Sequence, residues 1–408
     1  MRSSNKLKII NDPIYGFISI PNETIYDLIA HPYFQRLRRI SQMGLAFLVY
    51  PGAHHTRFHH ALGCMHLMQR TVGLLRMKNV QISDEEEHAL YAAILLHDIG
   101  HGPYSHAMEH SVVSGVEHEH ISLLFIQKLN EQMGGRLDLA IEIFSGNYHR
   151  PFLLQLIAGE LDMDRLDYLK RDSFFTGVAE GNVNSERLIT MLNVKDDQLV
   201  IEEKGIYSAE KFLLARRLMY WQVYLHKTSL AAEQLLIRVL RRAKELAAGG
   251  HEISVPGELN FFLHTPITID NFTDDVLHRF AQLDNTDVMM ALKLWCGHED
   301  RVLSELCCMI MNRNLPRIKL SNTQQPEEKL EKRVAQVMKK YKLTKHEASY
   351  LAFRGSVSNL AYNKRKPIRI LKKSGKVVDL LSTNEHLVIH AMTQPIQKFY
   401  LAFPKSLD

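Results

Sequence analysis

Histidine is concentrated in one short part of this 408-residue chain. Of the 22 histidines, 12 fall between His54 and His120. Imidazole is both a common metal ligand and the side chain that carries protons near neutral pH. A single buried histidine is usually satisfied by a neighbour, but that explanation does not account for a group of this size. The concentration therefore indicates a site that uses imidazole chemically.

Four positions form a candidate set of metal ligands. His60 lies in TRFHH, His97 and Asp98 are adjacent at the end of the apolar segment YAAILLHDIG, and Asp164 lies in ELDMDRLDYLKRDS. Two imidazoles and two carboxylates suit iron, manganese, zinc, nickel or magnesium, and no thiolate is present to select zinc. A lone His-Asp pair is weak evidence. An apolar helix followed by His-Asp and then GHGPYSH is a specific combination.

The elements that must position these residues are expected to be helical. From Ile25 to about Leu246, apolar residues recur at the i, i+3, i+4 and i+7 spacing of amphipathic helices. Ser83 is predicted to cap a helix that stops near Gly100. One long helix is predicted from about Ser208 to Leu246, ending at a glycine pair.

Alternating segments predict a little β-structure at the two ends of the chain. Residues 7–21, with DPIYGFISIP, predict a short hairpin, and KPIRILKKSGKVVDL predicts another. The tail EHLVIHAMTQPIQKFYLAF is expected to add a strand. The predicted fold class is mainly α, with a helical core and hairpin over 1–250, a helical extension over 251–320, and a smaller α+β region over 321–408.

Composition excludes several classes of protein. The hydrophobic content of 46% and charged content of 23% are typical of a soluble globular chain. No run approaches the ~18–20 apolar residues of a membrane span, and the start lacks a secretory signal, so a cytoplasmic location is expected. The cysteines have no paired CxxC spacing and predict reduced thiols. The net charge of +5 suits an anionic ligand.

A series of motifs resembles a known family. KIINDPIYG, HPYFQRLRRISQMG, YPGAHHTRFHHALG, LLHDIGHGPYSH, EHEH and LDMDRLDYLKRDS occur in family order over residues 7–175, with a fainter continuation through RRLMYWQVYLHK. They resemble the HD-domain superfamily, and more closely its deoxynucleoside triphosphate triphosphohydrolases, which include the vertebrate SAM-and-HD-domain enzyme. The resemblance implies hydrolysis of deoxynucleoside triphosphates to deoxynucleoside and inorganic triphosphate. It also implies one divalent metal ion, and a second Mg²⁺ accompanying the triphosphate.

Carried over by position, the resemblance assigns roles to residues of this chain. The implied metal ligands are His60, His97, Asp98 and Asp164. The implied catalytic group is His106 with Glu109, as an acid/base or nucleophilic relay, together with the phosphate-side His101 and His118. The implied substrate contacts are Arg57 on the phosphate nearest the metal, Gln42 on the sugar 3′-hydroxyl, Arg165, Tyr168 and Asp172 on the phosphates and sugar, and Arg216, Tyr224 and His226 on the triphosphate and base.

The resemblance also implies a nucleotide effector and a homo-oligomer, either a dimer or a tetramer. Lys8, Gln35 and Arg38 match residues of the family's activating site. Ala30 stands where the vertebrate enzyme has an aspartate that recognises guanine, so guanine selection is not carried over. Leu225 stands where that enzyme has glutamine, so the base preference is expected to differ.

The chemistry of triphosphate hydrolysis agrees with these residue types. A triphosphate is strongly anionic, and arginine supplies a permanent charge with bidentate geometry. Attack at the α-phosphorus requires a Lewis acid and a water molecule placed in line. The departing 5′-oxygen requires an acid, and a histidine restrained by a carboxylate suits that role.

Two other functions remain open at this stage. One is an HD phosphohydrolase acting on another nucleotide, such as a nucleoside monophosphate; the GYP signature of cyclic-dinucleotide enzymes and the extra Glu-Asp pair of alarmone hydrolases are missing. The other is a non-catalytic HD protein that binds nucleotides or nucleic acid, although such proteins are expected to lose a ligand or the relay histidine. The basic stretch NKRKPIRILKKSGK is typical of a solvated face, or of a surface for an effector, a subunit or nucleic acid.

Overall fold

The structure, a computed structural model, describes residues 8–109, 111–113, 115–253, 255, 257–383 and 393–408. The fold is mainly α, as predicted. The helices are α1 (Glu23–Ala30), α2 (Pro32–Gln35), α3 (Arg57–Met77), α4 (Asp84–Leu96), α5 (His106–Glu109), α6 (His118–Gln132), α7 (Asp138–Phe144), α8 (Pro151–Ala158), α9 (Met163–Thr176), α10 (Ser185–Met191), α11 (Ile206–Met219), α12 (Lys227–Ala248), α13 (Glu258–His264), α14 (Asp274–Phe280), α15 (Asn285–Trp295), α16 (Arg301–Met311), α17 (Glu327–Tyr341) and α18 (Lys345–Leu351).

Small sheets accompany the helices. The strands are β1 (Ile9–Asp12), β2 (Gly16–Ser19), β3 (Leu192–Lys195), β4 (Gln198–Glu202), β5 (Arg317–Ser321), β6 (Phe353–Asn359), β7 (Arg369–Leu371), β8 (Val377–Asp379) and β9 (Ile396–Phe403). β1 and β2 form the predicted N-terminal hairpin, and β7 and β8 form the second. β9 is the strand expected in the tail, and it lies between β5 and β6.

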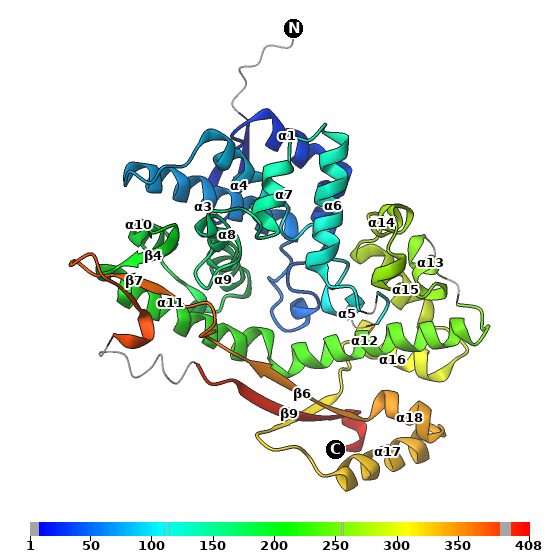
Figure 1. The fold of residues 1–408 in the computed structure, drawn as a ribbon. Helices are drawn as coiled ribbons and strands as arrows, with labels where there is room; N and C mark the ends of the chain where they lie inside the picture. Colours follow the sequence, from blue (N-terminus) through cyan, green and yellow to red (C-terminus); the bar gives the residue numbers. More distant parts are fainter. Residues whose placement is uncertain (1–7, 110, 114, 254, 256, 384–392) are drawn as a thin grey trace.

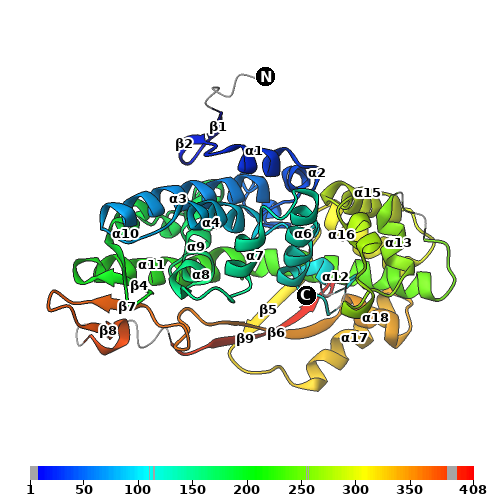
Figure 2. The ribbon, with the colours of Figure 1, turned by 45° about the horizontal axis from the view of Figure 1, so that its top comes forward.

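Helix α12 separates two parts of the fold (Figures 1 and 2). Helices α3, α4, α8 and α9 lie on one side of it, and strands β6 and β9 with helices α17 and α18 lie on the other. Strand β4 pairs in parallel with β7, so a strand of residues 198–202 shares a sheet with the C-terminal hairpin. The described helices include none with the length and apolar character needed to cross a membrane.

Helix α4 shows how local sequence fixes the position of the His-Asp pair. Ser83 is its N-cap, as predicted: the Ser83 side chain accepts from the Glu86 amide at 3.1 Å, and the Glu86 carboxylate accepts from the Ser83 amide at 2.9 Å. This reciprocal capping box satisfies two otherwise unpaired donors. The helix is buried over residues 89–96, because apolar side chains cover its whole circumference. It therefore ends, at His97, inside the protein.

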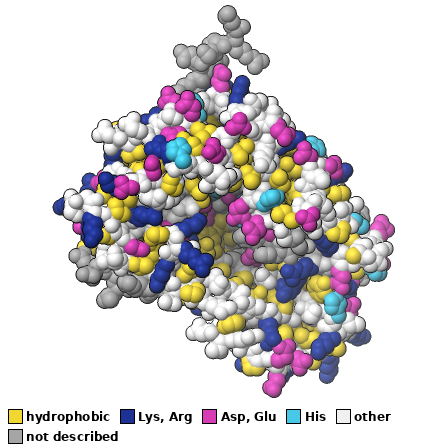
Figure 3. Space-filling view, in the orientation of Figure 1, with side chains coloured by type: hydrophobic (Ala, Val, Ile, Leu, Met, Phe, Trp, Pro, Cys, Tyr) yellow, Lys and Arg dark blue, Asp and Glu magenta, His cyan; other side chains and the backbone are white. Residues whose placement is uncertain are grey.

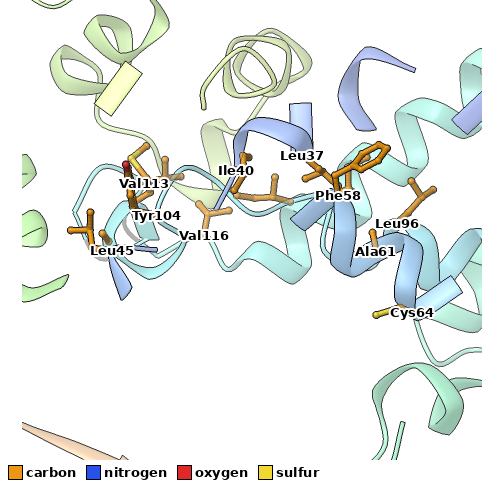
Figure 4. Close-up of a cluster of buried hydrophobic side chains, with 14 of the residues drawn as sticks. Leu37, Ile40, Leu45, Phe58, Ala61, Cys64, Leu96, Tyr104, Val113 and Val116 are labelled. Atoms are coloured by element: carbon orange, nitrogen blue, oxygen red, sulfur yellow. The ribbon is translucent and has the colours of Figure 1, made fainter. Parts of the chain in front are cut away.

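The core around α4 is built largely from α3. Phe58 and Ala61 of α3 lie with Leu96 of α4 and Leu37 in one buried cluster (Figure 4). Helix α3 also packs against α9. This contact is close at Gly63, where an added Cβ would lie 1.9 Å from Asp167 Oδ1. The three helices that carry the candidate ligands are thus joined in one core.

The long helix expected from Ser208 to Leu246 is not continuous, and this prediction was wrong. Helix α11 ends at Met219, residues Tyr220–Tyr224 form a π-helical turn, and α12 begins after the N-cap His226. The His226 ring accepts from the Thr228 amide at 3.2 Å and so starts a new helix. The apolar spacing continues across the break, which is why the sequence pattern did not reveal it. Single π turns often occur at functional sites.

The interval expected to be almost wholly helical also contains a hairpin, β3–β4. Its turn residues Asp196 and Asp197 have φ values of 52° and 51°. Two consecutive left-handed residues suit the tight turn of a two-residue hairpin, and aspartate tolerates this conformation better than most side chains. The flanking segments LNVK and QLVIE pair in antiparallel register. The Asp-Asp pair was the sequence signal for this turn, and it was missed because the surrounding segments show helical periodicity.

Candidate metal centre

The four candidate ligands come together from three parts of the chain. His60 lies on the first turns of α3, His97 and Asp98 follow α4, and Asp164 begins α9. The Nε2 atom of His60 lies 3.1 Å from Asp164 Oδ1 and 3.7 Å from Asp98 Oδ2. The Nε2 atom of His97 lies 3.6 Å from Asp164 Oδ1 and 3.5 Å from Asp98 Oδ1. Two imidazole nitrogens and two carboxylates therefore lie close together. His60, His97 and Asp164, together with Cys64, form a group that could hold a metal ion, and Asp98 forms a second such group with His101 and His118.

Neighbouring side chains lower the pKa of both carboxyls of the group. Burial opposes the ionisation of Asp98, but His97 and Arg57 outweigh it and hold the pKa of Asp98 well below its usual range. Burial likewise opposes the ionisation of Asp164, yet hydrogen bonds from His60 and His97 lower its pKa. Burial opposes protonation of His60 and His97, but Cys64 and the nearby carboxylates outweigh it and raise the pKa of both rings. A metal ion would therefore bind by displacing protons from these imidazoles.

Cys64 lies beside the group, one helical turn after His60. Its sulfur is 3.6 Å from His60 Nε2. Burial raises the pKa of the Cys64 thiol. Cys64 nevertheless belongs to the group with His60, His97 and Asp164 that could hold a metal ion, so a thiol lies at the site where the sequence analysis expected none. The expectation of reduced cysteines agrees with four free thiols in the structure.

The orientation of His60 is fixed by a chain of buried charges that the sequence analysis did not assign. Its Nδ1 lies 2.8 Å from Asp167 Oδ2, and Asp167 accepts two hydrogen bonds of 2.9 Å from Arg171. Arg171 in turn donates to Asp12 of β1 at 2.8 Å. A carboxylate behind a ligating histidine sets the tautomer and strengthens the ligand. The i, i+4 spacing of Asp167 and Arg171 was a usable signal, whereas Asp12 could be found only through the fold.

Arg57 reaches the same carboxylate as the ligand group. Its Nη1 donates to Asp98 Oδ2, and its Nη2 donates to Ser105 Oγ at 2.7 Å. Ser105 and the preceding Tyr104 have φ values of 42° and 54°, a conformation that is unusual for residues other than glycine. Such backbone strain is often found at functional sites. The loop GHGPYSH is thus bent so that Ser105 supports the guanidinium.

The predicted catalytic histidines lie near Asp98 Oδ1, whereas Arg57 contacts Asp98 Oδ2. His101 Nε2 is 3.4 Å from Asp98 Oδ1, and its ring stacks on His118 with centroids 3.8 Å apart. His118 Nδ1 lies 2.9 Å from Glu109 Oε1. Burial, with the nearby charge of Arg57, lowers the pKa of His101 to about 3. His106 begins α5, but its side chain lies outside the described residues.

Two predicted phosphate arginines share one buried acid. Glu160 lies 3.3 Å from Arg165 and 2.9 Å from Arg216, and it is only 6% exposed. Arg165 immediately follows the ligand Asp164 in the chain. Glu160 thus fixes both guanidinium groups beside the metal-ligand group, and the sequence analysis assigned it no role.

The predicted sugar and base contacts form a second cluster. Asp172 accepts from Tyr224 at 2.6 Å and lies 2.6 Å from His55 Nε2. The rings of Tyr168 and Tyr224 are 6.2 Å apart. The backbone amide of Gln42 donates to the backbone carbonyl of His55 at 3.0 Å, which places Gln42 beside this cluster. Tyr224 reaches Asp172 from the π-helical turn.

The predicted effector residues are only partly brought together. Gln35 accepts from Arg38 at 2.9 Å, and Arg38 lies over the ring of Phe58. Lys8 lies over the ring of Tyr26, with Nζ 2.9 Å from the centroid. These contacts place Gln35 and Arg38 side by side and give Lys8 a different partner.

Comparisons with known proteins agree with this geometry. Residues 57–172 match the HD domain family, and residues 183–253 match the HD associated region. YwfO of Bacillus subtilis, an uncharacterised protein, is 32% identical over 390 residues, which cover 91% of this chain and 87% of that protein. A deoxynucleoside triphosphate triphosphohydrolase SAMHD1 homologue from Dictyostelium discoideum is 30% identical over 276 residues, which span about half of its length, 53%.

A solved structure is similar over nearly the whole chain. A phosphohydrolase from Bacteroides thetaiotaomicron has 48% sequence identity and a TM-score of 0.95, covering 98% of this chain and all of that one. The four candidate ligands lie within the matched HD region, and His60, His97 and Asp164 belong to a group that could hold a metal ion. This chain belongs to the HD-domain phosphohydrolases.

Proposed function

We propose that the protein hydrolyses deoxynucleoside triphosphates to deoxynucleoside and inorganic triphosphate, with a divalent metal ion. The observation that carries this proposal is the placement of three arginines around the ligand group. Arg57 bonds to Asp98, and Arg165 and Arg216 are joined through Glu160 next to Asp164. A row of guanidinium groups beside a metal site suits a ligand with several phosphates better than one with a single phosphate.

The metal ion would be held by His60, His97, Asp98 and Asp164, and iron, manganese, zinc, nickel or magnesium all suit this donor set. When bound, the ion would supply the Lewis acid that polarises the phosphoryl oxygen of the α-phosphate. We propose that a second Mg²⁺ accompanies the triphosphate itself, since Mg²⁺ is usually held by substrate phosphates and few protein carboxylates.

The arginines have separate tasks in this scheme. Arg57 already lies against Asp98, so it is placed to donate to the phosphate nearest the metal. Arg165 and Arg216 would bind the outer phosphates, and their shared partner Glu160 keeps the two guanidinium groups from repelling each other. Charge-assisted hydrogen bonds of this kind are about twice as strong as neutral ones.

The departing group requires a proton. Water oxygen forms a bond to the α-phosphorus, the bond from phosphorus to the 5′-oxygen breaks, and that oxygen takes up a proton. Glu109 lies 2.9 Å from His118 Nδ1, so its carboxylate can orient the His118 ring and stabilise its protonated form. We assign proton transfer to this group, which also includes His101 and His106.

The sugar and base would lie over the Asp172 cluster. Gln42 Oε1 is buried and accepts no hydrogen bond from the described residues, so it is free to accept from a 3′-hydroxyl. The sugar and base would be contacted by Tyr168, Asp172, Tyr224 and His226.

We further propose that a nucleotide effector binds near Gln35, Arg38 and Lys8, and that the protein forms a dimer or tetramer. If the protein sediments as a monomer at micromolar concentration, with and without deoxynucleotide, the proposal that it forms an oligomer is wrong.

Product analysis tests the function directly. Metal-supplemented protein is incubated with each of the four deoxynucleoside triphosphates, singly and mixed, and the products are separated by chromatography. We expect deoxynucleoside and triphosphate in equal amounts, lost in Asp98→Ala and kept in the surface control Asp270→Ala. Faster turnover in mixtures than in single substrates would reveal the effector.

Two results would replace the proposal. Turnover of nucleoside monophosphates or other nucleotides, without turnover of triphosphates, would keep the HD site and change its substrate. Binding of nucleotide or DNA that a chelator leaves unchanged, with no turnover, would identify a binding protein instead. DNA binding would then weaken steeply with salt.

A further inference from the structure

A cavity of about 230 Å³ lies outside the metal centre, between the end of α8, the β3–β4 hairpin and residues 365–369. Its walls are apolar and include Leu154, Leu161, Leu199, Val200 and Ile368. An apolar cavity of this size is favourable for a small apolar group, because burial removes that group's surface from water.

The mouth of the cavity is basic. It is lined by Arg365, Lys366 and Arg369. None of these three side chains forms an ion pair with a described residue. Lys366 Nζ donates a hydrogen bond of 3.3 Å to the Ala158 carbonyl. Lys and Arg side chains gather on the side of the surface where β4 and β7 lie (Figures 1 and 3). Glu160 is the one acid among the lining residues, and Arg165 and Arg216 already neutralise it. The cavity thus combines an apolar interior with a positive rim that forms no ion pair within the described part of the chain.

We propose that this cavity binds a small amphipathic anion, with one apolar ring system or short chain inside and one carboxylate, sulfonate or phosphate at the mouth. A nucleobase suits the interior poorly. The side-chain amide of Gln155 already forms two hydrogen bonds: its Nε2 donates to Gln198 Oε1 at 2.8 Å, and its Oε1 accepts from the Leu199 backbone amide at 2.8 Å. The polar edge of a base would therefore be buried without partners, which costs about 1–3 kcal/mol for each group.

The cavity also touches the residues that hold the phosphate arginines. Gly159 and Glu160 line it, Arg165 donates to the Gly159 carbonyl, and Arg216 donates to the Ala361 carbonyl at 3.4 Å. A ligand between α8 and residues 365–369 would hold Glu160, and with it both guanidinium groups, in place. We expect occupancy to lower the KM for the triphosphate and to leave kcat unchanged. The expected change in KM rests on the proposed function, whereas binding of the anion in the cavity does not.

Calorimetric titration with 2-naphthalenesulfonate tests binding. The double variant Arg365→Glu/Arg369→Glu is expected to weaken binding by about tenfold or more, since each guanidinium contributes a charge-assisted hydrogen bond. The matched control is Lys373→Glu/Lys376→Glu, which makes the same change in charge in the turn between β7 and β8, outside the cavity lining. The control should keep the wild-type Kd. Ala158→Trp, at the exposed helix end, should fill the mouth and also block the uncharged 2-naphthol.

The outcomes separate the two proposals. No saturable binding by the wild type, or equal weakening in the two charge variants, would overturn the cavity site. Binding with an unchanged KM would overturn the coupling to the phosphate arginines. If the wild type turns over no deoxynucleoside triphosphate, the proposed function fails while the titration still decides the cavity, because calorimetry requires no turnover.

Discussion

His60 uses both nitrogens of its ring: Nε2 lies 3.1 Å from Asp164, while Nδ1 lies 2.8 Å from Asp167. Since Asp167 is an acceptor held by Arg171, it favours a proton on Nδ1, and a metal ion would bind on the Nε2 side of the ring, which faces Asp164. The position of this one ring therefore links a candidate ligand to the β1–β2 hairpin through Asp167, Arg171 and Asp12.

Replacing Asp167 should weaken metal binding without removing a ligand. Asp167→Asn keeps the size of the side chain but lets its amide donate toward His60, which favours the wrong tautomer. We expect metal affinity to fall by about 10–100-fold, measured by competition with a chelator of known affinity. The control Asp270→Asn, at an exposed site, should keep the wild-type affinity. A folded Asp167→Asn protein with unchanged metal affinity would remove this role.

Gly63 should tolerate no side chain. A Cβ at this position would lie 1.9 Å from Asp167 Oδ1 and 2.3 Å from Arg171 Nη2, so Gly63→Ala would force the buried pair apart. We expect a loss of about 1–3 kcal/mol or more in the free energy of unfolding. Gly73→Ala in the same helix is the matched control, because nothing lies within 4 Å of its Cβ. The control should gain up to about 1 kcal/mol from helix propensity. Equal effects in denaturant titrations would contradict the close approach of α3 and α9.

Much of this site could be predicted from local sequence, because capping and apolar spacing are local properties. Ser83 located the start of α4, and the apolar run after it placed His97 and Asp98 at the end of that helix, although the helix ends at Leu96 and not near Gly100 as predicted. The π turn at Tyr220–Tyr224 could not be predicted, since the apolar pattern continues through it. The bond between Arg171 and Asp12 joins residues 159 positions apart and depends on the packing of the whole domain.

Acid should remove the contribution of Glu86 to stability. Burial opposes its ionisation, but hydrogen bonds from Ser83 and Arg150 outweigh burial and hold the pKa of Glu86 below its usual range. A carboxyl whose pKa is lower in the folded state stabilises above its unfolded pKa, and that stabilisation is lost as the pH falls through the folded pKa. Glu86→Gln should therefore cost about 1–2 kcal/mol near pH 7 and progressively less from about pH 5 to pH 3. Urea titrations across this range, with the exposed neighbour change Glu85→Gln as control, measure the difference. A cost independent of pH would show that shape rather than charge holds this cap.

Gln42 should decide whether the 3′-hydroxyl is recognised. Its Oε1 is buried and accepts no hydrogen bond from the described residues, and an acceptor left unpaired in this way costs about 1–3 kcal/mol. A deoxynucleotide would satisfy it, whereas a 2′,3′-dideoxynucleotide would not, so the wild type should prefer the former by about tenfold or more in kcat/KM. Gln42→Leu removes the acceptor and keeps a similar volume, so it should lower kcat/KM for the deoxynucleotide and leave the dideoxynucleotide nearly unchanged. The dideoxy substrate is the internal control, because a merely structural defect would lower both values together. Parallel losses on the two substrates would therefore place the sugar elsewhere and give the Gln42 side chain a purely structural role.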